Sequence, residues 1–380
     1  MHPRKQIVIV GGGVAALETA IGLHESPNVE VGVKMIAPHH DFHYRPFAVL
    51  EPFGFHEYAR MSIRDLVAGC NVELVHDKVS RVDLTSKRVV LAKHPLIEFD
   101  ALVVASGAGQ VEAVRGATTV GGPDSTKHIQ HLLREIDSGI VGRVAFVAPP
   151  GASWTLPIYE FALLTAARAQ RQLSSKLHVI VATPEKRPLD AFGDEASERI
   201  ARMLAEAGIE LRTAVRVQSF SDGVLTTAPQ KEIEADRVIA LPHLVGRRIP
   251  GLPHDANGFL PIDLHGHVAD TDDVYAAGDI ADFPVKQGSI AAQQADAVVA
   301  ALAAHFGTQQ DSPPFHPQLH AVLFSEHGRT FLRAADHGGP HGGAAVSEEP
   351  LWEDAEKIFS KHLSQRMRRL RAAEMKMATR

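Results

Sequence analysis

A glycine turn between an apolar strand and a helix constrains this sequence more than any other feature. Residues 6–10 are a short β-branched run of the kind found in buried parallel strands, and residues 14–20 have the composition of a helix. The pattern Gly11-x-Gly13-x-x-Ala16 joins them. A strand, a glycine turn and a helix in this order form a dinucleotide-binding fingerprint, so we predict a Rossmann-type domain here.

Each small residue of the fingerprint has a physical role. Gly11 permits a tight turn, Gly13 lets the backbone approach a pyrophosphate, and Ala16 lets the helix pack closely on the strand. The N-terminus of the helix would then face the phosphates.

The acid that usually binds the ribose at the end of the second strand is missing. That strand is expected at residues 29–36, and Ala37-Pro38 follows it. The ribose therefore needs another partner, and Asp41 is one candidate.

Two further segments repeat the arrangement of a strand followed by a small-residue turn. One strand ends in a turn at residues 105–107, and another ends in Gly278-Asp279, after which a helix is expected at about residues 289–305. With the N-terminal turn, these segments resemble the FAD domain of the pyridine nucleotide-disulfide oxidoreductase-like superfamily. That resemblance implies an α/β fold with two Rossmann-like dinucleotide-binding domains, similar to glutathione reductase. Three unrelated strand–turn units are the alternative.

The resemblance implies a non-covalently bound FAD. It implies that Asp279 accepts a hydrogen bond from the ribityl chain and that the following helix points its positive N-terminus at the flavin ring. Lys286 precedes that helix, where a cation would stabilise a reduced flavin or a quinone oxygen; otherwise it is only a surface charge. The residues predicted to bind FAD are Gly11, Gly13, Ala16, Arg45, Ala105, Ser106, Gly107, Gly278, Asp279, Lys286 and Gln287.

The middle of the chain predicts a second Rossmann-like domain with an altered glycine loop. NADH-using relatives carry a glycine fingerprint after the strand expected at residues 143–148, but here Pro149-Pro150 follows it and Trp154 comes soon after. Proline has no N–H to bind a phosphate, and tryptophan fills the space that a phosphate needs. Glu185 stands where a ribose-binding acid could lie. We expect NADH to bind weakly.

Two short segments narrow the resemblance to one branch of the superfamily. His43-Tyr44-Arg45-Pro46 and Lys286-Gln287-Gly288 look like segments of sulfide:quinone oxidoreductases and type II NADH dehydrogenases, which implies a quinone as acceptor. The redox cysteines of the former are absent from the places expected for them, near Trp154 or Thr155 and near His320 or Ala321. Cys70 is the one cysteine and fits a packing role, so we do not expect sulfide oxidation through a thiolate.

Glu160 is the second predicted catalytic residue, as a proton acceptor in a cleft, with a charge at a helix start as the alternative. Histidine clusters occur at His39-His40-x-x-His43 and at His337-x-x-x-His341, but neither has cysteines nearby or the helical HExxH frame of a zinc site. We therefore predict solvated loops there and no bound metal.

The C-terminal region, residues 311–380, is expected to form a short strand-bearing interface and then a helix after Trp352. Its apolar positions recur at helical spacing among many arginines: Phe359, Leu363, Met367, Leu370 and Met377. A basic amphipathic helix of this kind binds a membrane surface, or it docks on the body or on a second subunit, as in a homodimer.

Charge and hydropathy limit the possible partners and location. The net charge of −6 argues against nucleic acid, and no apolar run is long enough to span a membrane. Without a recognisable signal peptide, we expect a cytoplasmic protein, with peripheral attachment to the inner face of the membrane as an option. The predicted domains are an FAD domain at 1–115 and 245–310, an NAD(P)-binding-like domain at 116–244, and the C-terminal region.

The predicted function is an FAD-dependent oxidoreductase. It would pass electrons from a two-electron donor, which the sequence does not identify, through the flavin to an acceptor, by resemblance a quinone. An NAD(P)H dehydrogenase and a flavin-binding electron-relay protein without turnover are the alternatives.

Overall fold

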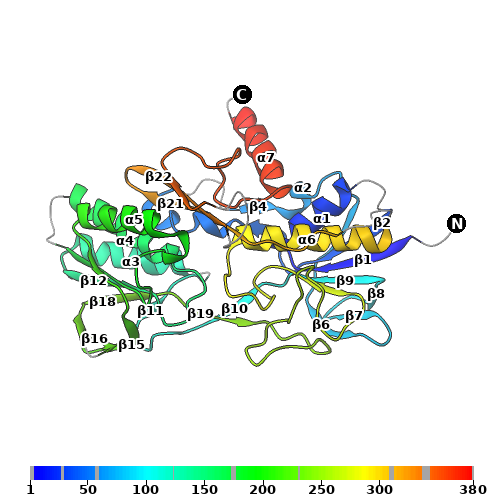
Figure 1. Ribbon diagram of the computed structural model, residues 1–380, viewed down its shortest axis with the longest axis horizontal. Helices are drawn as coiled ribbons and strands as arrows, with labels where there is room; N and C mark the ends of the chain where they lie inside the picture. Colours follow the sequence, from blue (N-terminus) through cyan, green and yellow to red (C-terminus); the bar gives the residue numbers. More distant parts are fainter. Residues whose placement is uncertain are drawn as a thin grey trace.

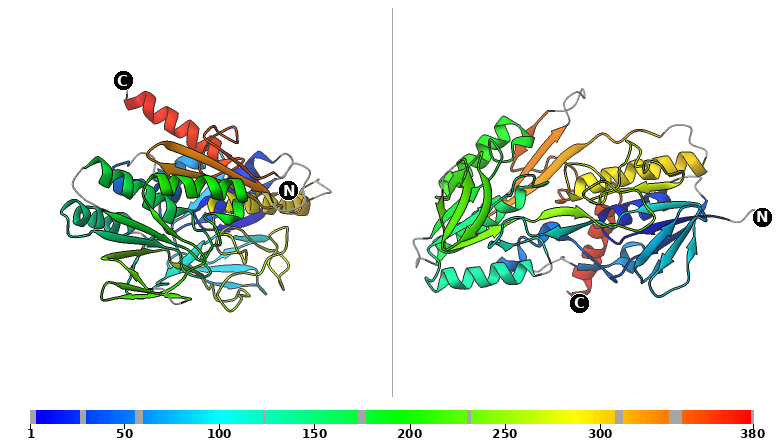
Figure 2. Two further views of the ribbon diagram at one scale, coloured as in Figure 1. Left: turned by 60° about the vertical axis from the view of Figure 1, so that its left-hand side comes forward. Right: turned by 90° about the horizontal axis from the view of Figure 1, so that it is seen from below.

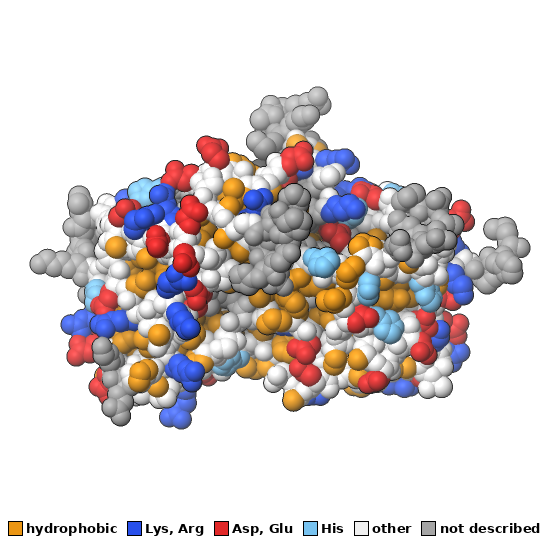
Figure 3. Space-filling model, viewed as in Figure 1, with side chains coloured by type: hydrophobic (Ala, Val, Ile, Leu, Met, Phe, Trp, Pro, Cys, Tyr) orange, Lys and Arg blue, Asp and Glu red, His pale blue; other side chains and the backbone are white. Residues whose placement is uncertain are grey.

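Two α/β lobes lie side by side along the long axis of the molecule, and the C-terminal region covers both (Figure 1). The computed structural model describes residues 4–26, 30–55, 60–122, 124–172, 177–229, 232–307, 312–335 and 343–378. Figure 3 shows acidic and basic side chains interspersed over both lobes on the face seen in Figure 1.

The first lobe is built on a five-stranded sheet in which every neighbouring pair is parallel. In sheet order its strands are β20 (Val274–Ala276), β9 (Ala101–Val104), β1 (Lys5–Val10), β2 (Val31–Ile36) and β5 (Val72–Val75). Ile7 and Ile9 of β1 pack towards helices α1 (Val14–Glu25) and α6 (Gly288–Phe306). Val8 and Val10 pack on the other face, against the antiparallel strands β6 (Val79–Asp83), β7 (Arg88–Leu91) and β8 (Ile97–Glu98). This alternation along a doubly buried strand explains its unbroken apolar run.

The second lobe repeats the plan with a second parallel sheet. Its strands are β11 (Thr118–Thr119), β18 (Arg237–Ala240), β12 (Arg143–Val147), β13 (His178–Ala182) and β14 (Glu210–Arg212). Helices α3 (Ser125–Asp137), α4 (Leu156–Arg171) and α5 (Asp194–Glu206) share one core with this sheet. The other face carries β15 (Arg216–Ser221), β16 (Val224–Ala228) and β17 (Ile233–Glu234).

The chain leaves the first lobe after β9 and returns to it before β20. The antiparallel pair β10 (Ala108–Val111) and β19 (His243–Gly246) carries these two crossings. The fold-class prediction of two Rossmann-like domains, the first of them discontinuous, is confirmed. The boundaries given for the domains stay a prediction.

Several short elements complete the lobes, and one segment among them, which carries Phe47, Leu50 and Phe53, packs from the first lobe against the core of the second. The short elements are β3 (Asp41–His43), β4 (Arg60–Ser62), α2 (Ile63–Leu66) and the 3-10 turns η1 (Arg45–Phe47), η2 (Glu51–Phe53) and η3 (Asp190–Phe192). The C-terminal region itself forms β21 (Gln318–Ser325), β22 (Gly328–Ala335), β23 (Ala345–Ser347) and α7 (Leu363–Ala378). Apolar side chains of β21 and β22 join the core of the second lobe.

The prediction of a helix directly after Trp352 is wrong, because α7 begins at Leu363. Ala355 has a left-handed backbone with φ 52°, which no α-helix contains, and the indole N–H of Trp352 donates to the Glu356 carbonyl. The intervening segment is therefore held in an irregular path by its own contacts.

The first turns of α7 dock on the body rather than face solvent. Leu363 and Met367 are buried in the core of the first lobe, and the Arg366 guanidinium donates to the Ala68 carbonyl at 3.0 Å and to Cys70 Sγ at 3.2 Å. Cys70 is a buried packing residue. The far end of α7 projects beyond the body (Figures 1 and 2). Within the described part of the chain, no helix is both long and apolar enough to cross a bilayer.

A buried carboxylate holds the start of α7. Glu18 of α1 accepts the backbone N–H of His362 at 2.8 Å and that of Leu363 at 2.7 Å. Burial, and then the nearby negative charge of Asp296, raises the pKa of Glu18 to about 8. The side chain of His362 makes a second contact with α1, because its Nδ1 lies 2.6 Å from the Glu25 carboxylate.

We predict that Glu18 makes folding stability fall as the pH rises from about 4.5 to about 8. Between the ordinary pKa of the unfolded chain and the raised pKa of the folded one, only the folded protein holds the proton. Each pH unit in this window then costs up to about 1.4 kcal/mol for one proton. The free energy of unfolding, measured in urea at pH 5, 6.5 and 8, should therefore fall less with rising pH for Glu18→Gln than for the wild type. Glu198→Gln, at an exposed carboxylate of α5, is the control, and identical pH slopes in all three proteins would contradict the prediction.

Candidate functional site

Three small-residue turns meet at one edge of the first sheet. The carboxyl ends of β1, β9 and β20 lie there side by side because the strands are parallel. A Cβ atom added to Gly11, whose φ is +136°, would lie 2.1 Å from the Ala105 carbonyl oxygen. A Cβ added to Gly278 would lie 3.2 Å from the Ala15 methyl group at the start of α1. Gly11, Ala105 and Gly278 are therefore brought together, as the sequence predicted.

The edge fits a bound dinucleotide. Gly13 is the N-cap residue of α1 without a side-chain cap, and a Cβ added there would meet nothing within 4 Å, so the helix N-terminus is open to a ligand. Ala16 is fully buried, which allows the close packing of α1. Ser106 Oγ and Gln287 Nε2 are buried polar atoms that lack a hydrogen-bond partner among the described residues. Unpartnered polar atoms beside an open turn are what a polar ligand satisfies.

Asp279 follows the turn after β20, and two cations, Lys286 and Arg45, act on its carboxylate. Asp279 is partly buried, and its carboxylate accepts no hydrogen bond from the described residues. Burial raises the pKa of Asp279, whereas Lys286 and then Arg45 lower it, so both cations act on this carboxylate. Arg45 itself is exposed at the start of η1.

Lys286 is held in place by its own neighbours. Its ammonium donates to the Ala281 carbonyl and lies 3.9 Å from the centre of the Phe259 ring. Burial lowers the pKa of Lys286 to about 8, while Asp279 and other acids raise it. Gln287 caps the helix that follows, because its Oε1 accepts the Ser289 N–H at 3.1 Å.

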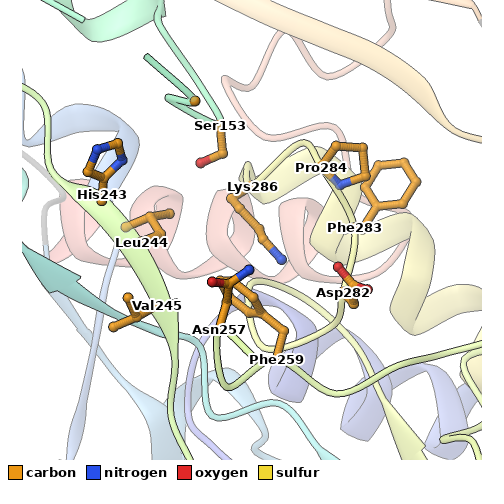
Figure 4. Close-up of a pocket in the computed structure, with 11 residues that line it drawn as sticks. Ser153, His243, Leu244, Val245, Asn257, Phe259, Asp282, Phe283, Pro284 and Lys286 are labelled. Atoms are coloured by element: carbon orange, nitrogen blue, oxygen red, sulfur yellow. The ribbon is translucent and has the colours of Figure 1, made fainter. Parts of the chain in front are cut away.

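A pocket of about 340 Å³ lies beside Lys286, between the lobes. Gly151 and Ser153 of the altered glycine loop contribute to its wall, as does β19. In Figure 4 the Lys286 side chain reaches into the pocket between Asn257 and Asp282. The remaining lining residues are His243, Leu244, Val245, Phe259, Phe283 and Pro284.

Glu160 lies in a buried ion pair and not in an open cleft. Its Oε1 accepts a hydrogen bond from the Lys357 ammonium and from the Phe324 N–H at 3.0 Å. Burial raises the pKa of Glu160, and Lys357 opposes this. The sequence pattern did not identify Lys357, since nothing local links it to a residue so far away along the chain. Glu160 does not line the pocket, and its catalytic role stays a prediction.

Aromatic rings connect this ion pair to the loop of the first lobe. The Lys357 ammonium lies 4.2 Å from the centre of the Phe324 ring, which stacks on Phe47 at 5.6 Å. Phe47 in turn lies 5.1 Å from the ring of Tyr44, which precedes Arg45.

Glu185 is fully engaged by hydroxyl groups of its own lobe. It follows β13, where a ribose-binding acid could lie, but its carboxylate accepts hydrogen bonds from Tyr159 at 2.6 Å, Thr183 at 2.8 Å and Thr155 at 3.0 Å. Trp154 packs edge-on against Phe192 at 5.9 Å. These contacts fix the altered loop to the end of β13, and weak NADH binding stays a prediction.

The histidine clusters do not converge on a metal site in the described residues. His40 packs on His76, and His43 Nε2 lies 3.4 Å from the Glu51 carboxylate. His337 and His341 lie outside the residues that the structure describes. The group with metal-ligand spacing in the described ranges is formed by Glu18, Asp296 and His362, whose ligand atoms lie within 4.8 Å of one another. Both oxygens of Glu18 are already used by backbone N–H groups.

Comparison with known proteins places these features in a family context. Residues 5–295 match the family described as pyridine nucleotide-disulphide oxidoreductase. The chain is 26% identical over 246 residues to a sulfide-quinone reductase of Aquifex aeolicus, an alignment that covers 62% of this chain and 54%, or about half, of that relative. It is 26% identical over 306 residues to an NADH dehydrogenase-like protein of Mycobacterium tuberculosis, which covers 73% of this chain and 72% of the relative.

Solved structures share the fold. The sulfide:quinone oxidoreductase of Aquifex aeolicus superposes with a TM-score of 0.78 and 20% identity, and covers 90% of this chain and 86% of that one. The NDH2 of Plasmodium falciparum superposes with a TM-score of 0.69 and 13% identity, and covers 90% of this chain and 92% of that one.

We predict opposite outcomes for two glycines of the first turn. Gly11→Ala should destabilise even the apoprotein by more than about 1 kcal/mol, because its Cβ would clash with Ala105 and its φ is positive. Gly13→Val should fold, since a Cβ there meets open space, but it should not retain FAD. Thermal unfolding of the apoproteins and chromatography of the flavin released on heating test both. Full FAD occupancy in Gly13→Val, or FMN in place of FAD in the wild type, would show that the turn is misassigned.

Proposed function

Because this chain belongs to the pyridine nucleotide-disulphide oxidoreductase family, we propose that it passes electrons from a small two-electron donor through FAD to a quinone. The family confirms the coarser predictions: the chain is an FAD-dependent oxidoreductase, and FAD is its cofactor. The small donor and the quinone acceptor are proposed.

The arrangement of Asp279 and Lys286 next to the pocket carries the proposal. The Asp279 carboxylate has no hydrogen bond among the described residues and suits a ribityl hydroxyl, and Lys286 places a positive charge at the start of α6. FAD, when bound, takes two electrons from the donor and passes them to the acceptor. The positive charge of Lys286 would favour the negative charge that this transfer brings into the site. With a pKa of about 8, the Lys286 ammonium also holds a proton near neutral pH.

The donor side of the proposal is the pocket between the lobes. A volume of about 340 Å³ is at the lower end of the range for small-molecule sites, so it suits a small donor. Ser153, His243 and Asn257 offer hydrogen bonds to it. Pro149, Pro150 and Trp154 remove the donors and the space that a pyrophosphate would need, so we do not propose NADH.

The acceptor side is inferred from relatives and from the Glu160–Lys357 pair. A sulfide-quinone reductase is among the relatives, but Cys70 is buried under Arg366, so this chain offers no thiol for sulfide. A quinone takes up two protons with two electrons. The buried Glu160–Lys357 pair could supply one of these protons and solvent the other, and the pair lies against Phe324, which stacks on Phe47 of the first lobe.

The projecting end of α7 fits the same proposal. Quinones dissolve in lipid, so we propose that this end meets a membrane surface while its first turns stay docked. Peripheral attachment of this kind needs no helix that crosses the bilayer.

We predict that NADH reduces the flavin slowly and that a soluble quinone reoxidises it. Anaerobic stopped-flow mixing with NADH, NADPH and small donors follows the first step by bleaching of the flavin absorbance. Photoreduced protein mixed with a short-chain quinone follows the second step. Reduction that saturates at micromolar NADH would favour an NAD(P)H dehydrogenase instead. Reduced flavin that no quinone reoxidises would remove the quinone from the proposal.

We predict that Lys286→Met lowers the rate of flavin reduction by the best donor about 10- to 100-fold. The reason is the loss of a charge that would balance the incoming negative charge. Lys361→Met, at an exposed lysine, is the matched control and should react like the wild type. Equal rates in the three proteins would mean that Lys286 is only a surface charge.

A further inference from the structure

A small buried residue, Ala37, occupies the position at which a ribose-binding acid is expected. Ala37 directly follows β2 and is buried, and its N–H donates to the Val75 carbonyl at 3.0 Å. Gly12 packs against it, because a Cβ added there would lie 3.1 Å from the Ala37 Cβ. Asp41, the candidate from the sequence, is exposed and pairs with Ser62 in the β3–β4 ladder.

Two histidine rings lie beside this position, since the His76 ring is next to the Ala37 backbone. His76 follows β5, the sheet neighbour of β2, and its ring packs on that of His40 with centroids 3.8 Å apart and planes inclined by 42°. The His40 carbonyl accepts the Ile63 N–H at 2.9 Å, which ties its loop to the start of α2. We call His40 and His76 the imidazole pair.

His76 has an unused hydrogen-bonding atom. Its Nδ1 is buried without a hydrogen-bond partner in the described ranges. Burial, and then the charges of His40 and Arg64, lower the pKa of His76, while a hydrogen bond with the Ala37 backbone raises it. A neutral imidazole offers one N–H donor and one acceptor nitrogen, and either can serve a sugar hydroxyl.

The nearest buried acid is already occupied. Asp77 follows His76, but its carboxylate accepts the N–H groups of Lys78, Lys93 and His94 at 2.7 to 2.9 Å. His94 Nδ1 also lies 2.8 Å from it. Asp77 is therefore not a substitute for the missing acid, although it fixes the loop that carries His76.

We propose that His76, positioned by His40, replaces the missing acid and hydrogen-bonds the adenosine ribose of FAD. The proposal rests on FAD as the cofactor and is independent of the donor and the acceptor. A neutral ring would hold the ribose through an uncharged hydrogen bond, which is weaker than the charge-assisted one that a carboxylate makes. Removal of one such bond should cost about 2- to 10-fold in affinity.

The test compares FAD with its 2′-deoxyadenosine analogue on the apoprotein, by the quenching of flavin fluorescence on binding. The wild type should bind FAD about 2- to 10-fold more tightly than the analogue. His76→Phe keeps a ring to pack on His40 but has no nitrogen, so it should bind the two ligands equally. His39→Phe, at an exposed neighbour, should keep the wild-type preference. His76→Asn keeps a donor and an acceptor, so it should keep part of the wild-type preference for FAD over the analogue.

Each outcome decides one point. An undiminished preference for FAD in His76→Phe would overturn the proposal, and so would equal binding of both ligands by the wild type. If His76→Phe bound neither ligand, His76→Asn would decide: a retained preference supports the ribose contact, and equal binding overturns it. If neither the wild type nor His39→Phe bound FAD, the cofactor assignment itself would fail.

Discussion

The close approach of Gly11 to the Ala105 carbonyl is the contact on which the rest of the first lobe depends. No side chain fits between the two strand ends, since an added Cβ would lie only 2.1 Å from that oxygen. The approach lets β1 and β9 end at the same level and brings the N-terminus of α1 to the sheet edge. Gly278 then packs on α1 from the third strand. Once these turns are fixed, the cofactor edge has the positive end of a helix and unpartnered polar atoms around it.

The C-terminal region is part of both lobes and is not an appendage. Two buried carboxylates, Glu18 in the first lobe and Glu160 in the second, are each satisfied by the segment between residues 357 and 363. A buried carboxylate without partners would cost several kcal/mol, so each lobe requires this segment to be in place. One short stretch of chain thereby links the two lobes, and the pocket between them has walls from both.

Local sequence patterns predicted much of this fold, but they could not predict contacts between residues that are far apart in the sequence. The helix expected at 289–305 is α6 (Gly288–Phe306), and the strand expected at 143–148 is β12 (Arg143–Val147), because turns and apolar runs are local signals. The start of α7 was missed because a left-handed Ala355 leaves no mark in an apolar pattern. Lys357 lies 197 residues from Glu160, and only the folded chain shows that they pair. The cluster of hydroxyls on Glu185 was missed for the same reason.

The hydroxyl cluster also explains how the end of β13 is stabilised in the second Rossmann-like lobe. Without partners, a carboxylate at the end of β13 would be left partly buried and unsatisfied. Tyr159, Thr183 and Thr155 donate hydrogen bonds to the Glu185 carboxylate, and they draw the altered loop onto the strand end. Thr155 lies at the start of α4, so the same bonds anchor the helix that carries Glu160. The loop is thereby fixed as a wall of the pocket, which Gly151 and Ser153 line together with Lys286.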